Sequence, residues 1–342
     1  MKPLKKILLV LYPELRNSAG LRLARQLAER SGAQLQLLLC VFDPMVELAA
    51  ARVQQLAKAQ LLQQHSLWLD QLAAQWRNAG LQLQCELFWT EHAEEAVVAR
   101  ALEQMPDLVI RDLVTPGNEH GEHGEHAPAL SMSDWRLARL CPAPLLLLRQ
   151  DRAGLPRRIA VAADVGVEAA TPTPAAGSIN DLLATTALRM AIYAGAETHA
   201  VYSFPYRRPN RRPSVVVGIS ASISRLHREV HDAAVENFHQ FARAYSLPEE
   251  RAHWLDPQQE PALALQQFVR EQHIDLLVLG SRQHRRLERL LLGSVSESLL
   301  RQLPCNLLLV KPPQFAEDLH RYVDVPALRQ RYDEQAASAD VA

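Results

Sequence analysis

Short apolar runs alternate with longer amphipathic stretches along this chain. Apolar runs bounded by glycine, proline or charged residues are typical of strands buried on both faces of a parallel sheet. Stretches with an apolar residue at every third or fourth position predict helices between them. In the first half the predicted strands are Lys6–Leu11, Gln34–Phe42, Leu81–Trp89, Asp107–Ile110 and Pro144–Leu148. The predicted helices there are Ser18–Arg30, Val46–Asn78, Glu91–Gln104 and Ser133–Leu140.

The same order of elements restarts at Arg158. The predicted strands of the second half are Arg158–Ala163, Thr198–Phe204, Arg251–Leu255, Ile274–Leu279 and Leu307–Val310. Its predicted helices are Asn180–Ala194, Ala221–Tyr245, Pro261–Gln272 and a segment that follows Gly293. Local sequence repeats as well, since Asp107-Leu108-Val109-Ile110 parallels Asp275-Leu276-Leu277-Val278. The chain is therefore predicted to be an α/β protein of two tandem doubly wound parallel-sheet domains.

Length and composition agree with two ordinary domains and exclude several classes of protein. The 342 residues divide into predicted domains at 1–152 and 153–315, followed by a polar tail at 316–342. A net charge of −1 and an aromatic share of 6% favour neither nucleic acid nor a membrane as partner. The four cysteines are scattered without paired spacing, and no apolar run reaches membrane-spanning length. We therefore expect a cytoplasmic protein.

The stretch from Ile274 to Lys311 carries the clearest chemical signal. An apolar run ends abruptly at Gly280, a basic segment follows, and Gly293-Ser294 opens a helical pattern. The first N–H groups of a helix have no partner within the helix, and the helix dipole favours negative charge there. The strand, glycine loop and helix therefore predict a site for a phosphate-bearing ligand.

The spacing of four residues in this stretch resembles the nucleotide loop of the universal stress protein family. The family pattern is glycine, two residues, glycine, nine residues, then Gly-Ser or Gly-Thr, and here Gly280, Gln283, Gly293 and Ser294 occupy those positions. Gln283 departs from the pattern, and its side chain either crowds a phosphate or donates a hydrogen bond to it. The element order over about residues 4 to 315 is similar to that of the tandem, E-type bacterial members. Three stretches add to the likeness: Ser133-Asp134-Trp135 through Cys141-Pro142-Ala143-Pro144, Ala79-Gly80 leading to Trp89, and Lys311-Pro312.

The resemblance implies the universal stress protein fold, which is like that of the adenine nucleotide alpha-hydrolases, and an ATP site, with magnesium, in the second half. In such sheets the ligand lies at the carboxyl ends of the strands, where the strand order reverses. Asp164 would face the adenosine, and Val201 would pack against the base. The remaining binding residues implied are Gly280, Arg282, Gln283, Gly293, Ser294 and Val295.

Each of these residues also has a purely structural interpretation. Asp164 suits a turn, Val201 suits an ordinary core, and a basic loop suits a solvated surface. Ser294 and Glu297 have the spacing of a capping box, in which the serine hydroxyl only caps the helix.

The first half lacks the same residues at the matching positions. Tyr12 stands where Asp164 stands, Asp112 where Gly280 stands, and Ser131-Met132 where Gly293-Ser294 stand. Bulkier residues keep a backbone from approaching a phosphate, so the first half is predicted not to bind nucleotide in this mode.

Two further segments carry charge without a fixed geometry. The loop at residues 119–126 alternates histidine and glutamate with glycine, which suggests either a transition-metal site or a disordered polar loop. The basic run Arg207–Pro213 is interpreted as a solvated loop rather than a nucleic-acid patch.

These observations predict a stress-response binding and regulatory protein rather than an enzyme. Nucleophile-elbow, zinc-protease and phosphate-loop motifs are all missing from the sequence. The expected partner is a small molecule, with no nucleic acid and no membrane. The halves are expected to form an intramolecular pseudo-dimer through the strands Pro144–Leu148 and Leu307–Val310, and further homo-oligomerisation is left open. The alternative function is binding of an apolar or lipid-like metabolite without a nucleotide site.

Overall fold

A computed structural model gives the fold of the chain. The described residues are 2–113, 130–149, 154–163, 165, 177–203, 217–255, 259–280, 292–302, 305–321 and 323–339. They form two compact units. The first comprises the described residues of 1–155, residue 292 and residues 306–339, and the second comprises those of 156–280 and 293–305. The last strand and the C-terminal helices thus belong to the first unit, whereas the sequence placed residues up to 315 in the second domain.

The first unit contains a six-stranded sheet with the order β3-β2-β1-β4-β5-β10. Its strands are β1 (Lys6–Leu11), β2 (Gln34–Val41), β3 (Leu83–Trp89), β4 (Leu108–Leu113), β5 (Leu145–Arg149) and β10 (Asn306–Val310). Strands β1 to β5 pair in parallel, and β10 pairs with β5 in the antiparallel direction. The expected contact between the two last strands of the repeats is therefore present, with Leu308 opposite Leu146.

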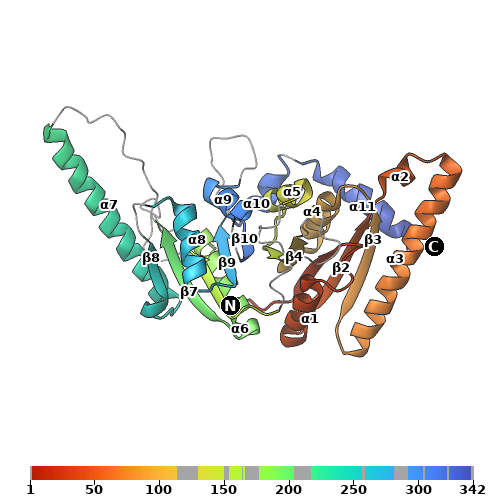
Figure 1. The fold of residues 1–342 in the computed structure, drawn as a ribbon, viewed down its shortest axis with the longest axis horizontal. Helices are drawn as coiled ribbons and strands as arrows, with labels where there is room; N and C mark the ends of the chain where they lie inside the picture. The colour runs from red at the N-terminus through yellow and green to blue at the C-terminus, as the bar shows by residue number, and fades with distance from the viewer. Residues whose placement is uncertain are drawn as a thin grey trace. The chain divides into compact units, whose positions relative to one another are not determined.

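The helices of the first unit cover both faces of this sheet (Figure 1). They are α1 (Ala19–Ser31), α2 (Pro44–Glu47), α3 (Ala51–Asn78), α4 (Ala93–Gln104), α5 (Met132–Leu140), α10 (Phe315–Leu319) and α11 (Val325–Ala339). Right-handed crossovers place α1 and α3 on one face and α4 and α5 on the other. Ser18 begins α1 by accepting a hydrogen bond from the backbone of Leu21, and Gly32 ends it in the left-handed conformation.

The single helix predicted over Val46–Asn78 is wrong at its start. Asp43 caps the short helix α2, which ends at Glu47, and α3 begins only at Ala51. Leu48 lies in the break and is 81% exposed, so no core contact holds a continuous helix there.

The second unit repeats the arrangement with the strand order β9-β6-β7-β8, all parallel. Its strands are β6 (Arg158–Ala162), β7 (Glu197–Ser203), β8 (Ala252–Leu255) and β9 (Leu276–Gly280). Its helices are α6 (Ile179–Ala194), α7 (Val217–Ala244), the 3-10 turn η1 (Glu249–Arg251), α8 (Pro261–Glu271) and α9 (Ser294–Gln302). This mixed α/β fold with a mainly parallel sheet is the predicted fold class.

Equivalent hydrogen bonds confirm that the two units are repeats of one design. The Asp107 carboxylate accepts from the backbone N–H groups of Lys5 and Lys6, and Asp275 accepts in the same way from Arg157 and Arg158. These aspartates tie the start of the first strand to the turn before the fourth strand in each repeat.

The segment predicted as a polar tail is helical and partly buried. Helix α11 packs against α4 and β3, and its Tyr332 has no exposed surface. Within the described part of the chain, none of the helices is both long and apolar enough to cross a membrane.

Candidate functional site

The carboxyl end of β9 and the first turn of α9 meet in the second unit. The Ser296 hydroxyl donates to the carbonyl of Gly280, with an O–O distance of 3.4 Å. The backbone N–H of Glu297 donates to the carbonyl of Gly293 at 2.9 Å. Gly293 is therefore the N-cap residue of α9, and the N–H groups of the helix's first turn lie beside the end of β9.

The two glycines of this site differ in what surrounds them. A Cβ atom on Gly280 would lie 3.2 Å from Ile179 Cγ1 and 3.3 Å from Leu183 Cδ1, so the packing of α6 explains this glycine. At Gly293, no heavy atom of the described structure lies within 4 Å of the position a Cβ would take. Packing among the described residues therefore does not explain why residue 293 is glycine.

The remaining predicted site residues fall into three groups. Val201 lies in β7 with no exposed surface, as a core valine would. Ser294 is exposed and is the first residue inside α9, so it does not occupy the N-cap position that a capping box with Glu297 requires. Val295 follows it and is half-buried. Asp164, Arg282 and Gln283 lie outside the described residues.

In the first unit, the position that matches Gly280 is filled by a carboxylate. Asp112 is 1% exposed, and its Oδ1 accepts a 2.8 Å hydrogen bond from the backbone N–H of Gly20 near the start of α1. A Cβ on Gly20 would lie 2.5 Å from Asp112 Oδ2, so this contact requires glycine. The Asp112 carboxylate therefore occupies a helix N-terminus that favours an anion.

A buried network fills the rest of the same edge in the first unit. The Arg111 guanidinium lies 3.9 Å from the centre of the Tyr12 ring, and its Nε is 3.1 Å from Asp134 Oδ1. Asp134 also accepts from the backbone and hydroxyl of Ser131 in the capping box that begins α5. Burial raises the pKa of Tyr12 well above its ordinary value. Tyr12 and Ser131, which replace Asp164 and Gly293, thus both donate hydrogen bonds to Asp134.

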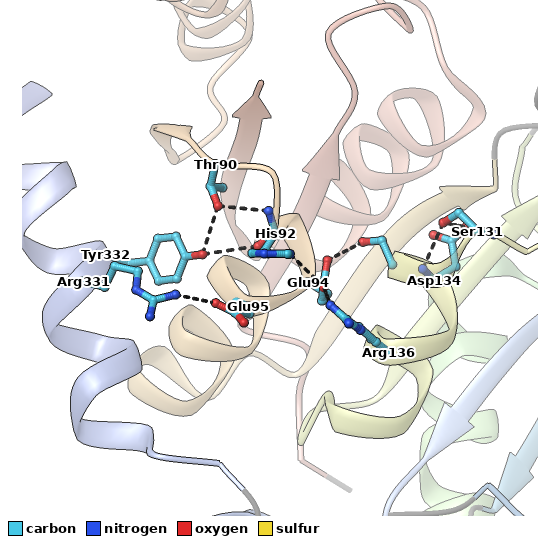
Figure 2. Close-up of polar contacts among 10 residues, drawn as sticks. Thr90, His92, Glu94, Glu95, Ser131, Asp134, Arg136, Arg331 and Tyr332 are labelled. Atoms are coloured by element: carbon cyan, nitrogen blue, oxygen red, sulfur yellow. Dashed lines mark hydrogen bonds and ion pairs between the residues drawn. The ribbon is translucent and has the colours of Figure 1, made fainter. Parts of the chain in front are cut away.

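A second polar cluster lies beside this network and was not identified from the sequence. Glu94, near the start of α4, is 3% exposed and accepts from the Ser133 hydroxyl at 2.7 Å and from Arg136 at 3.0 Å (Figure 2). Burial acts to raise the pKa of Glu94, but the hydrogen bonds from Ser133 and Arg136 outweigh it and hold the pKa below its usual value. The cluster joins α4 to α5, and nothing in the local sequence around Glu94 indicates its distant partners.

A histidine pair in the second unit was also missed. His199 on β7 and His253 on β8 share a hydrogen bond, with 3.0 Å between Nδ1 of the first and Nε2 of the second. Burial lowers the pKa of both imidazoles. The equivalent strands of the first unit are joined by Gln36 and Glu86, whose side chains are 2.6 Å apart. The two repeats thus place different polar pairs at one position.

The metal hypothesis has no site in the described residues, since they contain no group of three histidine, cysteine, aspartate or glutamate side chains able to hold an ion. The histidine and glutamate loop at 119–126 and the basic run at 207–213 lie outside these residues.

Comparisons with known proteins agree with the fold and the repeat. Residues 180–311 match the model of the universal stress protein family. The chain is similar to universal stress protein E of Escherichia coli K12, with 21% identity over 91% of this chain and 95% of that protein. A universal stress protein E homolog of Haemophilus influenzae is 23% identical over 90% of this chain and 97% of that protein.

Two solved structures share the fold along most of their length. A universal stress protein of Pseudomonas aeruginosa UCBPP-PA14 superposes with a TM-score of 0.68 and 21% identity, covering 93% of this chain and 97% of that one. One from Archaeoglobus fulgidus gives a TM-score of 0.56 and 14% identity, covering 89% and 98%. The second half therefore carries a domain that matches the universal stress protein family, and the chain as a whole is similar to tandem universal stress proteins in sequence and fold.

Proposed function

We propose that the protein is a cytoplasmic binding and regulatory component of the stress response that takes ATP, with magnesium, in its second half. The observation that carries this proposal is the meeting of Gly280 and Gly293 where β9 ends and α9 begins. Backbone N–H groups at a helix start, next to the carboxyl end of a central strand, suit a phosphate. Gly293 leaves that approach clear, and the described packing supplies no other reason for it.

The proposed contacts are given from the adenosine end of the nucleotide to its phosphates. Asp164 would face the adenosine, and Val201 would lie in the strand beneath the base. Arg282 and Gln283 would contact the phosphates beside the α9 N-terminus. Val201 has no exposed surface, so it would support the base site from within the sheet rather than contact the adenine itself.

The first unit takes no nucleotide in this proposal. Its Asp112 carboxylate occupies the α1 N-terminus, and a phosphate there would meet a buried negative charge. One binding event per chain is therefore expected. In this proposal the protein binds and releases ATP without consuming it, and turnover measured with excess ATP tests that part of the proposal.

Calorimetric titration with ATP and magnesium tests the site directly, with Gly293→Glu as the disabling variant. The space around Gly293 lets the variant fold, while the glutamate blocks phosphate by bulk and charge. Met132→Glu is the matched control, because it adds the same charge at the first residue of α5, where Met132 is 71% exposed.

The expected result is one equivalent of heat in the parent and in Met132→Glu, and none in Gly293→Glu. Bound ATP should also raise the melting temperature, since a ligand at a hundred times its Kd contributes about 2.7 kcal/mol. No heat and no change in melting temperature at millimolar ATP would refute the nucleotide site. Mass spectrometry of copurified molecules would then test for an apolar metabolite.

A further inference from the structure

The C-terminal helix α11 contacts the first unit through a buried tyrosine. Tyr332 packs its ring edge-on against Phe88 of β3, with 5.4 Å between ring centres and a 78° angle between planes. Its hydroxyl donates to the carbonyl of His92 at 3.3 Å and lies 3.2 Å from the Thr90 hydroxyl (Figure 2). Tyr332 has no exposed surface, so this end of the chain fills a specific pocket.

An arginine beside this pocket holds the backbone and an acidic side chain of α11. Arg100 of α4 is 4% exposed and donates to the carbonyl of Tyr332 and to the Asp333 carboxylate. It also forms ion pairs with Glu86 and Glu103 of its own unit. Because two carboxylates remain when α11 leaves, release of the helix does not strand a buried charge.

Two arginines of α11 complete the contact. Arg331 lies 2.8 Å from Glu95, and Arg329 donates to the carbonyl of Leu102 at 2.9 Å. Leu102 lies in the last turn of α4, whose carbonyls lack partners within the helix. Tyr332, Asp333, Arg331 and Arg329 lie within five consecutive residues, so the surface recognises one short helical segment.

The repeat explains why this surface belongs to the first unit. Arg100 lies seven residues before Asp107, and the residue seven before the equivalent Asp275 is Phe268. Phe268 is buried against His253, so the second unit has an aromatic side chain where the first has the anchoring arginine.

We propose that this face of α4 and β3 is a helix-binding site whose second occupant is α11 of another copy of the chain. The sequence of α11 matches every contact that this face offers. A second copy of the chain supplies an identical helix. Helix α10 is anchored separately by Phe315 and Leu319, so α11 can exchange while the preceding chain stays in place. Exchange of an identical element between copies requires no new contact.

Cross-linking between two full-length variants tests this exchange. One chain carries Glu95→Cys and the other Arg331→Cys, and a short bifunctional maleimide joins them only when α11 docks in trans. The matched control pairs Glu95→Cys with Asp70→Cys, an exposed position on α3 away from the site. Native cysteines contribute equally to both mixtures.

After concentrated mixing, the first pair should give about tenfold more heterodimer than the control, which corresponds to about 1.4 kcal/mol in favour of the specific contact. Adding Tyr332→Ala to the Arg331→Cys chain should return the yield to the control level, and excess peptide of residues 325–339 should do the same. Equal heterodimer in both mixtures would overturn the proposal and show that α11 binds only within its own chain.

Discussion

Truncating Tyr332 to alanine should release α11 while the rest of the first unit stays folded. Removing a fully buried aromatic side chain costs about 3–5 kcal/mol, of which the edge-on pair with Phe88 contributes about 1. The loss cannot exceed the free energy that holds α11 in place, because beyond that point the helix simply detaches. Arg100 keeps Glu86 and Glu103 as partners after detachment, so no buried charge adds to the cost.

Hydrogen exchange measures the detachment of α11 directly, at the amides of that helix. A loss of about 3 kcal/mol lowers the protection of the α11 amides by roughly a hundredfold, while β1 and β4 keep theirs. Tyr332→Phe is the control, since it keeps the ring and loses only the contacts to Thr90 and His92, for about 1 kcal/mol. Unchanged α11 protection in the alanine variant, or equal losses throughout the first unit, would refute the argument.

The histidine pair and the two glycines give further expectations. Burial lowers the folded-state pKa of His199 and His253, so the unfolded chain binds more protons and stability falls as the pH drops below about 6.5. Replacing the pair with the first unit's glutamine and glutamate (His199→Gln with His253→Glu) should flatten the slope of unfolding free energy against pH, and an unchanged slope between pH 7 and 5 would contradict this. Gly280→Ala should destabilise the second unit by about 1–3 kcal/mol by crowding α6, whereas Gly293→Ala should cost at most about 1 kcal/mol in urea unfolding, because it changes only the N-cap residue of α9. Equal effects of the two alanines would show that the crowding at Gly280 is relieved without cost.

The sequence predicts the strands well because a parallel sheet buries both faces of its central strands. Runs such as Ile7–Leu11 in β1, between β2 and β4, have no polar position to accommodate, so they stand out from their surroundings. The same reasoning fails at helix boundaries. The apolar pattern near Val46 continues into α3, and only the exposure of Leu48 shows that no core lies beneath the break.

The tail shows a different limit of sequence reasoning. Val325, Leu328 and Tyr332 have helical spacing and form a buried stripe, which is visible in the sequence. Their partners lie more than two hundred residues away on β3 and α4. An apolar stripe predicts that a helix packs against another element. Only the fold shows that Arg100 is the side chain that binds this helix.

The sequence predicts which residues replace the glycines in the first unit, but it does not predict the contacts that those residues make. Local sequence indicates that Asp112 replaces the glycine found at Gly280, because each lies five residues after the equivalent aspartates Asp107 and Asp275. It does not indicate that the Asp112 carboxylate binds the backbone of Gly20, since that contact depends on the approach of α1 to β4. The glycine required at position 20 becomes understandable only once the carboxylate beside it is placed.

The two repeats have different residues at the equivalent positions of their sheets. In the first unit, Asp112 fills a helix N-terminus, and Arg111 and Asp134 neutralise each other at the carboxyl end of the sheet. Each of these contacts adds a satisfied polar group to the core and removes a position where a ligand's charge could be accepted. The second unit has glycines at the matching positions, which add nothing to packing at Gly293. The proposed nucleotide site therefore lies in the second unit, where no described side chain approaches the position that a Cβ of Gly293 would take.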